Sequence, residues 1–214
     1  MTSRRVVPAN RRMLATLIVG CAVVVVVLGS RYADASRPGR IDRFIDRRLR
    51  YRFGTHLRLL NHVVDLGDPA SIVTLCAVLV LGFVLARRYR LAILAALGPA
   101  VAAGLTEFVL KPTFGRRLDG YLSFPSGHTT GTVAVAVVVV VFLLGPSKPR
   151  LALVWRALLA AAAIAEALAV ATALIGAGYH YATDTVGGCC VSIATIIALG
   201  WTIDVIADAR ARYS

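Results

Sequence analysis

The chain has 214 residues, of which 58% are hydrophobic and only 16% are charged, and its mean hydropathy is +0.75. Soluble globular domains have closer to half apolar residues and about a quarter charged residues. This composition therefore excludes an ordinary soluble domain and indicates membrane insertion. The formal net charge is +13, which in a soluble chain would suggest nucleic acid. Here the basic residues flank apolar blocks, so we expect anionic lipid headgroups as partners and no nucleic acid.

Six apolar blocks approach the length of about 20 residues that one membrane crossing requires. They show no alternation at period two, which argues against a barrel, and otherwise only helices satisfy the backbone within lipid. The sequence therefore predicts an all-α polytopic membrane protein, a six-helix bundle within one domain (13–207), between a basic N-terminal segment (1–12) and a basic tail (208–214). The predicted spans lie near residues 13–29, 70–86, 91–110, 129–144, 151–176 and 185–207.

The first block also fits a secretory signal peptide, because an Arg-rich start precedes an apolar run and Ala33-Asp34-Ala35 offers a small-residue cleavage site. The run is long for a signal peptide and Arg31 intervenes, so we expect a retained helix. The following segment, 36–60, alternates apolar residues with arginines at helical spacing. This pattern predicts a helix in the headgroup plane with its arginines on lipid phosphates, the alternative being a solvated basic loop.

Orientation in the cell membrane is not decided by the positive-inside rule, since the two sides carry nearly equal numbers of Lys and Arg. We favour a cytoplasmic N-terminus because the arginines of 36–60 have an interfacial role and those near 111–117 have a proposed functional one. This orientation puts the loops after the third and fifth spans on the extracytoplasmic face.

Three polar clusters lie in or beside those loops. Because the fourth and fifth spans form an out-and-back pair, all three clusters are predicted at the same membrane face, whichever way the N-terminus points. The first follows the third span, the second precedes the fourth, and the third lies between the fifth and sixth: Lys111, Arg116 and Arg117; Ser126, Gly127 and His128; His180 and Asp184.

The residue types of these clusters suit phosphate chemistry. Lysine and arginine supply positive charge, and arginine can fork onto phosphate oxygens. The "PSGH" turn opens a helix, whose N-terminal amides form an anion site, to which Ser126 adds a hydroxyl. The i, i+4 spacing of His180 and Asp184 would make them neighbours on a helix that begins near residue 180. Asp184 could then orient His180 as a nucleophile, with His128 as general acid. No acidic cluster suited to Mg²⁺ is apparent, so we expect neither a metal nor a cofactor.

Other unusual residues carry less information. Glu107 lies one helical turn before Lys111 and is expected to pair with it and orient it. Glu166 lies in the middle of the fifth span, where an acid indicates function, but the sequence offers no partner for it. The cysteines all lie in apolar blocks without metal-ligand spacing, which is typical of buried thiols: Cys21, Cys76, Cys189 and Cys190.

Taken with their order along the spans, "K…GR", "PSGH" and "GYHYATD" resemble the motifs of the type 2 phosphatidic acid phosphatase superfamily, which also contains the vanadium haloperoxidases. The resemblance covers roughly residues 60–205. It implies a six-helix membrane phosphatase of the haloperoxidase-like fold, independent of metal and working through a phosphohistidine. Residue by residue, it implies that Lys111, Ser126 and Gly127 bind phosphate, that His128 is the acid, that His180 is the nucleophile and that Asp184 orients it.

The chain departs from the family pattern at two places. The first motif usually ends in Arg-Pro, where this chain has Leu118-Asp119, and Arg116 and Arg117 are close enough to substitute. The third motif usually has an arginine six residues before the nucleophile, where this chain has Leu174. Each missing contact could remove about 1.5–3 kcal/mol of charge-assisted hydrogen bonding.

The sequence thus predicts a phosphatase acting on a phosphorylated membrane lipid. Prenyl mono- or diphosphate is the first substrate expected, and phosphatidate or phosphatidylglycerol phosphate the next. The departures leave open a non-catalytic lipid-phosphate binder or transporter on the same scaffold, and a lipid phosphotransferase. A haloperoxidase is the least favoured, because those relatives are soluble.

Overall fold

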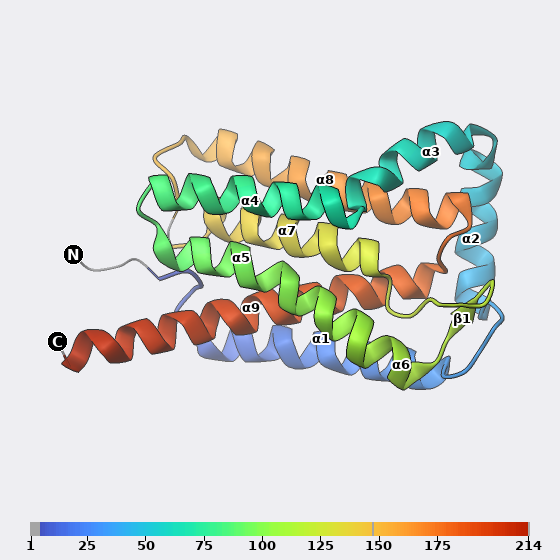
Figure 1. Cartoon of the computed structure of the whole chain (residues 1–214), viewed down its shortest axis with the longest axis horizontal. Coiled ribbons are helices and arrows are strands. Elements are labelled where there is room, and N and C mark those ends of the chain that lie inside the picture. The colour runs from blue at the N-terminus through green and yellow to red at the C-terminus, as the bar shows by residue number, and fades with distance from the viewer. Residues whose placement is uncertain (1–4, 147, 214) are drawn as a thin grey trace.

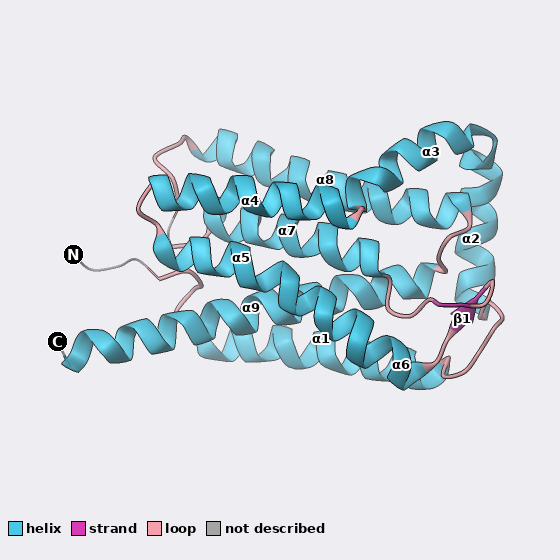
Figure 2. Ribbon diagram, in the orientation of Figure 1, coloured by secondary structure: helices cyan, strands magenta, loops and turns pink. Residues whose placement is uncertain are grey.

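The computed structural model describes residues 5–146 and 148–213 and forms a bundle of long, roughly parallel helices (Figure 1). The helices are α1 (Arg11–Arg31), α2 (Arg40–Phe53), α3 (Leu57–Val64), α4 (Pro69–Leu85), α5 (Tyr89–Gly104), α6 (Lys111–Phe114), α7 (Gly127–Leu144), α8 (Leu153–Ala177) and α9 (Ala182–Tyr213), with short turns η1 (Gly54–His56) and η2 (Asp65–Gly67) and a π-helix η3 (Leu105–Leu110). The described strands, β1 (Arg117–Leu118) and β2 (Tyr121–Leu122), form one antiparallel hairpin (Figure 2).

The described residues contain five or six candidate membrane spans, which agrees with the predicted polytopic helical bundle. Five segments are individually long and apolar enough to cross a membrane: α1, α5 continued through η3 and α6, α7, α8 and α9. The sixth, α4, meets the criterion together with the helical segment 40–67, from which it is bent by 47°. The bend lies at Asp68, because Pro69 occupies the first turn of α4 and the residue before a proline avoids helical geometry.

The helix α7 lies at the centre of the bundle and is the most buried of the candidate spans. It packs against α5, α8 and α9, and its small and β-branched side chains allow this close packing. Ala134 and Val138 are fully buried with Leu94 of α5 and Ile196 of α9. Since α7 begins at the "PSGH" turn, the whole core fixes the position of that turn.

The segment 36–60 is helical, and α2 lies across one end of the bundle (Figure 1). The side of α2 that faces α8 and α9 buries two carboxylates, Asp42 and Asp46. The hydrophobic residues Ile41 and Phe44 remain exposed, on the part of α2 that is free to meet lipid. The helix is therefore attached to the bundle through acidic groups, which the pattern of arginines and apolar residues did not predict.

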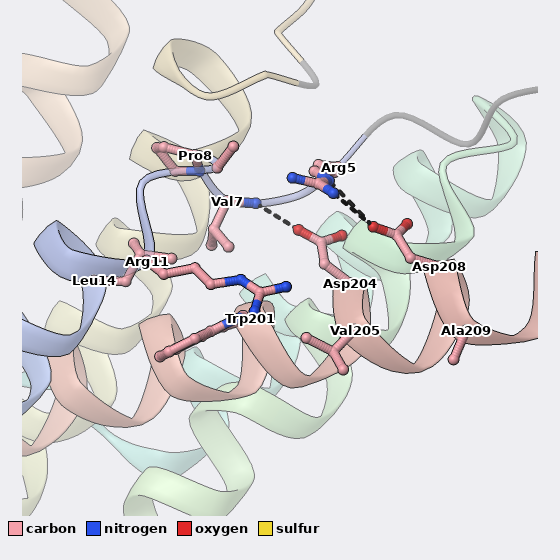
Figure 3. A pocket seen from close by; sticks show the side chains of 11 residues that line it. Arg5, Val7, Pro8, Arg11, Leu14, Trp201, Asp204, Val205, Asp208 and Ala209 are labelled. Atoms are coloured by element: carbon pink, nitrogen blue, oxygen red, sulfur yellow. Dashed lines mark hydrogen bonds and ion pairs between the residues drawn. The ribbon is translucent and has the colours of Figure 1, made fainter.

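The opposite end of the bundle holds residues 5–10, which precede α1, and the C-terminal part of α9 (Figure 1). There the buried carboxylate of Asp204 accepts the backbone N–H groups of Val6 and Val7 at 2.9–3.0 Å and pairs with Arg90 at 3.0 Å. A cavity of about 240 Å³ opens beside this contact, between α9 and the start of α1 (Figure 3). Val6, Val7 and Leu14 lie in the main core, so α1 packs as part of the bundle.

Candidate active site

The three predicted polar clusters lie at the end of the bundle crossed by α2. The turn before α7 and the first turn of α9 are joined directly, because the N–H of Ser126 donates to the carbonyl oxygen of Asp184 at 3.0 Å. The structure thus brings the "PSGH" and "H-x3-D" motifs together.

The "PSGH" turn begins a helix, as predicted. Ser126 is the N-cap of α7, and its side chain accepts the N–H of Thr129 at 3.3 Å. The N–H groups of the first helical turn have no carbonyl partner within the helix. Those of Gly127 and His128 belong to this turn, so the positive end of the α7 dipole is directed toward the cluster.

The sequence predicted that His180 and Asp184 lie on one helix that begins near residue 180. In the structure α9 begins at Ala182, so His180 precedes the helix and Asp184 lies in its first turn. The backbone N–H of His180 donates to Leu174 in the turn that ends α8. His180 Nδ1 lies 3.5 Å from Asp184 Oδ2, within ion-pair range but without hydrogen-bond geometry. Such distances are common in unliganded sites and shorten when substrate binds.

Arg116 has a different role from the one its sequence position indicated. Its guanidinium is fully buried: Nη1 donates to Asp184 Oδ1 and Nη2 to Asp42 Oδ2, each at 2.6 Å. The rings of Tyr32 and Tyr181 lie 4.3 and 4.4 Å from its central carbon. Both terminal nitrogens are held by protein oxygens away from solvent, so we correct the predicted phosphate contact: Arg116 links α2 to the carboxylate of Asp184.

Asp42 and Asp46 of α2 complete this buried network. Asp42 Oδ1 accepts the N–H of Thr183 at 3.0 Å, and Asp46 Oδ1 accepts that of Ala182 at 3.1 Å. Burial raises the pKa of Asp42, but hydrogen bonds from Thr183, Gly39 and Arg116 outweigh burial and lower it below its usual value. Burial raises the pKa of Asp46 to about 6, and nearby Asp42 adds to this effect. The two carboxylates cap the N-terminus of α9 and thereby fix His180 and Asp184.

Lys111 and Glu107 form the expected pair, with Lys111 Nζ 2.8 Å from the carboxylate. The π-helix η3 carries Glu107, and such bulges are frequent at functional sites. A Cβ atom added to Gly127 would collide with the Glu107 carboxylate and lie 3.7 Å from Lys111 Nζ. Glycine at the start of α7 therefore lets the first and second clusters meet.

The remaining charged position of the first cluster faces solvent. Arg117 is exposed on β1, and its Nη1 donates to the carbonyl of Gly120 at 3.0 Å. Leu118, at the position of the missing family arginine, belongs to the same hairpin, whose Asp119-Gly120 turn has positive φ at both residues. An Asp-Gly pair is a strong hairpin signal in a sequence.

Leu174, at the other departure from the family pattern, is buried in an apolar cluster. It packs with Leu60 and Val64 of α3 and Val170 of α8. Hydrophobic contacts with α3 thus occupy the position at which the family pattern has an arginine.

One more acidic residue contacts the predicted site. Asp68, at the bend before α4, places Oδ1 3.0 Å from His128 Nε2. Neither Asp68 nor Asp42 was identified as a site residue from the sequence. Within the described residues, no group of three or more His, Cys, Asp or Glu side chains is arranged to hold a metal ion.

The fold and the cluster geometry together define a class: a polytopic helical membrane protein with two histidines and the N-terminus of a central helix at one end of its bundle. The family model of the PAP2 superfamily matches residues 12–205, and the chain belongs to that superfamily. It is therefore a member of a family of membrane phosphatases.

A solved structure shares this fold. It is described as the first transmembrane PAP2 type phosphatidylglycerolphosphate phosphatase from Bacillus subtilis, and it superposes with a TM-score of 0.69 at 18% sequence identity. The match covers 91% of this chain and 97% of that one. A search of curated proteins gave no match.

Proposed function

We propose that this protein hydrolyses a lipid phosphate or diphosphate at the membrane surface through a phosphohistidine intermediate. The observation that carries the proposal is the meeting of the "PSGH" turn and the "H-x3-D" turn, joined by the bond from Ser126 N–H to the Asp184 carbonyl. Two histidines from separate helix starts then belong to one site, beside a lysine and the open end of a helix dipole.

In the proposed mechanism, the phosphate oxygens are held by Lys111, by Ser126 and by the first N–H groups of α7, which include that of Gly127. The exposed Arg117 contacts the lipid headgroup. His180 Nε2 attacks phosphorus while Asp184 orients the ring and stabilises its positive charge. The bond between phosphorus and the lipid oxygen breaks, and protonated His128 gives its proton to that oxygen. His128 then takes a proton from water, whose oxygen attacks the phosphohistidine, releasing inorganic phosphate and restoring His180.

The proposed substrate is a phosphorylated membrane lipid. We place prenyl mono- or diphosphate first and phosphatidate or phosphatidylglycerol phosphate next. The last of these is named in the description of the similar solved structure. No metal or cofactor takes part in the proposed steps.

The test is phosphate release by purified protein in detergent with EDTA. His180→Ala is expected to abolish release, and Asp184→Asn to reduce kcat by at least about 100-fold, given what general-acid–base and orienting groups contribute. His56→Ala is the matched control, because His56 is exposed on η1 and outside the cluster. Acid-labile label on the wild type, absent from His180→Ala, would support the covalent step. Equal release by wild type and His180→Ala would refute the mechanism.

A second candidate is a non-catalytic lipid-phosphate binder. It is favoured by the small number of cations available to a phosphate. Arg116 is paired with two carboxylates, and Leu118 and Leu174 stand where the family pattern has arginines. Of the positions that match the family's basic residues, Lys111 is therefore the one beside the start of α7. Binding of the lipid without turnover, and without a trapped phosphohistidine, would identify a binder. Transfer of the labelled phosphate to an added lipid alcohol in preference to water would identify a phosphotransferase.

We also propose that the site faces the extracytoplasmic side. The β1–β2 hairpin provides the probe, because Tyr121 is exposed at the same end as the site. In a variant without native cysteines, Tyr121→Cys should react with an impermeant maleimide in intact cells. Labelling only after permeabilisation would contradict this orientation.

A further inference from the structure

The contact between Asp68 and His128 adds a residue to the proposed reaction. His128 Nε2 lies 3.0 Å from Asp68 Oδ1, and both side chains are partly exposed at the site, by 33% and 48%. We propose that Asp68 is a positioning residue for His128: it accepts Nε2–H, so that Nδ1 is the nitrogen that exchanges the proton with the leaving lipid oxygen. This inference rests on the proposed phosphatase function.

The Asp68 carboxylate is not used by its own helix. Asp68 is the N-cap of α4, a position at which an aspartate usually accepts an N–H of the first turn. Here the side chain makes no capping hydrogen bond. It is directed to a residue 60 positions later in the sequence. A structural role in starting α4 therefore does not account for the carboxylate.

The turn that carries Asp68 is held by other contacts. The N–H of Asp68 donates to the Asp65 carbonyl at 3.3 Å, and the hydroxyl of Ser71 donates to the same carbonyl at 2.7 Å. The Asp68 carbonyl accepts the N–H of Ile72 at 3.0 Å. All of these survive truncation of the Asp68 side chain, so its removal should leave the turn in place.

The position of Asp68 relative to His128 is set by close backbone packing. A Cβ atom added to Gly67 would lie 3.3 Å from His128 Cβ, 3.3 Å from Thr132 Cγ2 and 3.0 Å from Val170 Cγ1. The backbone just before Asp68 thus rests directly on α7 at the turn that carries His128. The bend between the segment 40–67 and α4 delivers the carboxylate to the imidazole.

This arrangement suits a general acid. Accepting Nε2–H fixes the tautomer and the orientation of the ring, as carboxylates do for catalytic and metal-binding histidines. The negative charge also stabilises the imidazolium that must exist before the proton is given away. When the bond to the lipid oxygen breaks, the proton leaves from Nδ1 and the neutral ring keeps its Nε2–H on Asp68. No further reactant is needed.

The kinetic test compares Asp68→Ala with Asp65→Ala, its matched control. Asp65 precedes Asp68 by one turn and is exposed, with only a 3.8 Å contact to His62. With an alkyl phosphate, whose leaving group needs a proton, Asp68→Ala should lower kcat by on the order of 10- to 100-fold, with KM within about twofold. With p-nitrophenyl phosphate, whose leaving group needs none, kcat/KM, which reports the steps up to formation of the phosphohistidine, should change by less than about threefold. Asp65→Ala should behave as wild type with both.

A second measurement does not depend on turnover. In protein labelled with ¹⁵N-histidine, the neutral His128 should show the Nε2–H tautomer, and Asp68→Ala should lose this preference while Asp65→Ala keeps it. If wild type releases no phosphate, the proposed function fails and the tautomer still decides the inference. Equal kcat for the two variants with the alkyl phosphate, equal losses of kcat/KM on both substrates, or an Nδ1–H tautomer in the wild type would overturn it.

Discussion

Removal of Arg116 is the sharpest test of how this site is built. Arg116→Ala leaves Asp42 and Asp184, both fully buried, facing each other without the guanidinium that separates them. Breaking a buried ion pair by deleting one partner costs about 3–5 kcal/mol. The lost contacts with the Tyr32 and Tyr181 rings add about 1 kcal/mol or more. Asp42 keeps its N–H donors, so we expect a total loss of about 4–5 kcal/mol.

For a chain of this length, such a loss lowers the unfolding midpoint by about 10–20 °C. The assay is thermal unfolding of purified protein in detergent, with Arg117→Ala as the neighbouring control. Arg117 is exposed and makes one bond to a hairpin carbonyl, so its removal should cost less than about 0.5 kcal/mol. Arg116→Lys should fall between the two, because a point charge cannot serve both carboxylates.

Adding Asp42→Asn to Arg116→Ala should recover part of the lost stability, since it removes one of the two unpaired buried charges. A similar midpoint for Arg116→Ala and Arg117→Ala would refute the buried bridge. No recovery in the double variant would show that the two carboxylates do not repel each other in the folded protein.

Three further outcomes are expected. Gly127→Ala should raise KM about tenfold with little change in the unfolding midpoint, because the added Cβ displaces the Glu107–Lys111 pair at the proposed phosphate site. The control Gly54→Ala has open space around it and should change neither KM nor the midpoint. The raised pKa of Asp46 means that its protonation stabilises the fold: this contribution is full below about pH 4 and is lost as the pH rises through about 6. Unfolding midpoints measured between pH 4 and 7 should therefore fall with rising pH in wild type and fall less in Asp46→Asn, and parallel curves would contradict the assignment. Asp204→Ala removes the acceptor of two N–H groups and one of the two carboxylates paired with Arg90, so it should cost about 2–4 kcal/mol in thermal unfolding. The more exposed Asp208→Ala should cost about 1 kcal/mol or less.

The sequence by itself determined the spans and the end of the bundle at which the site lies. Apolar blocks of fixed length must be helices in lipid, and a helix that leaves the membrane must return, so counting spans placed the three clusters at one end. The "PSGH" motif also fixed the start of α7, because Ser126 can cap only the helix that follows it. The Glu107–Lys111 pair followed from helical spacing alone. These are local or periodic properties, which adjacent residues decide.

Only the tertiary structure decided which charges face each other. Arg116 is as basic in sequence as Arg117, yet one is buried between two carboxylates and the other is exposed. Asp42 lies 74 positions from Arg116, and Asp68 lies 60 positions from His128, so no spacing rule could connect them. Such pairings depend on how α2 and the bend before α4 pack against α7 and α9, and that packing is set by the whole core rather than by any one motif.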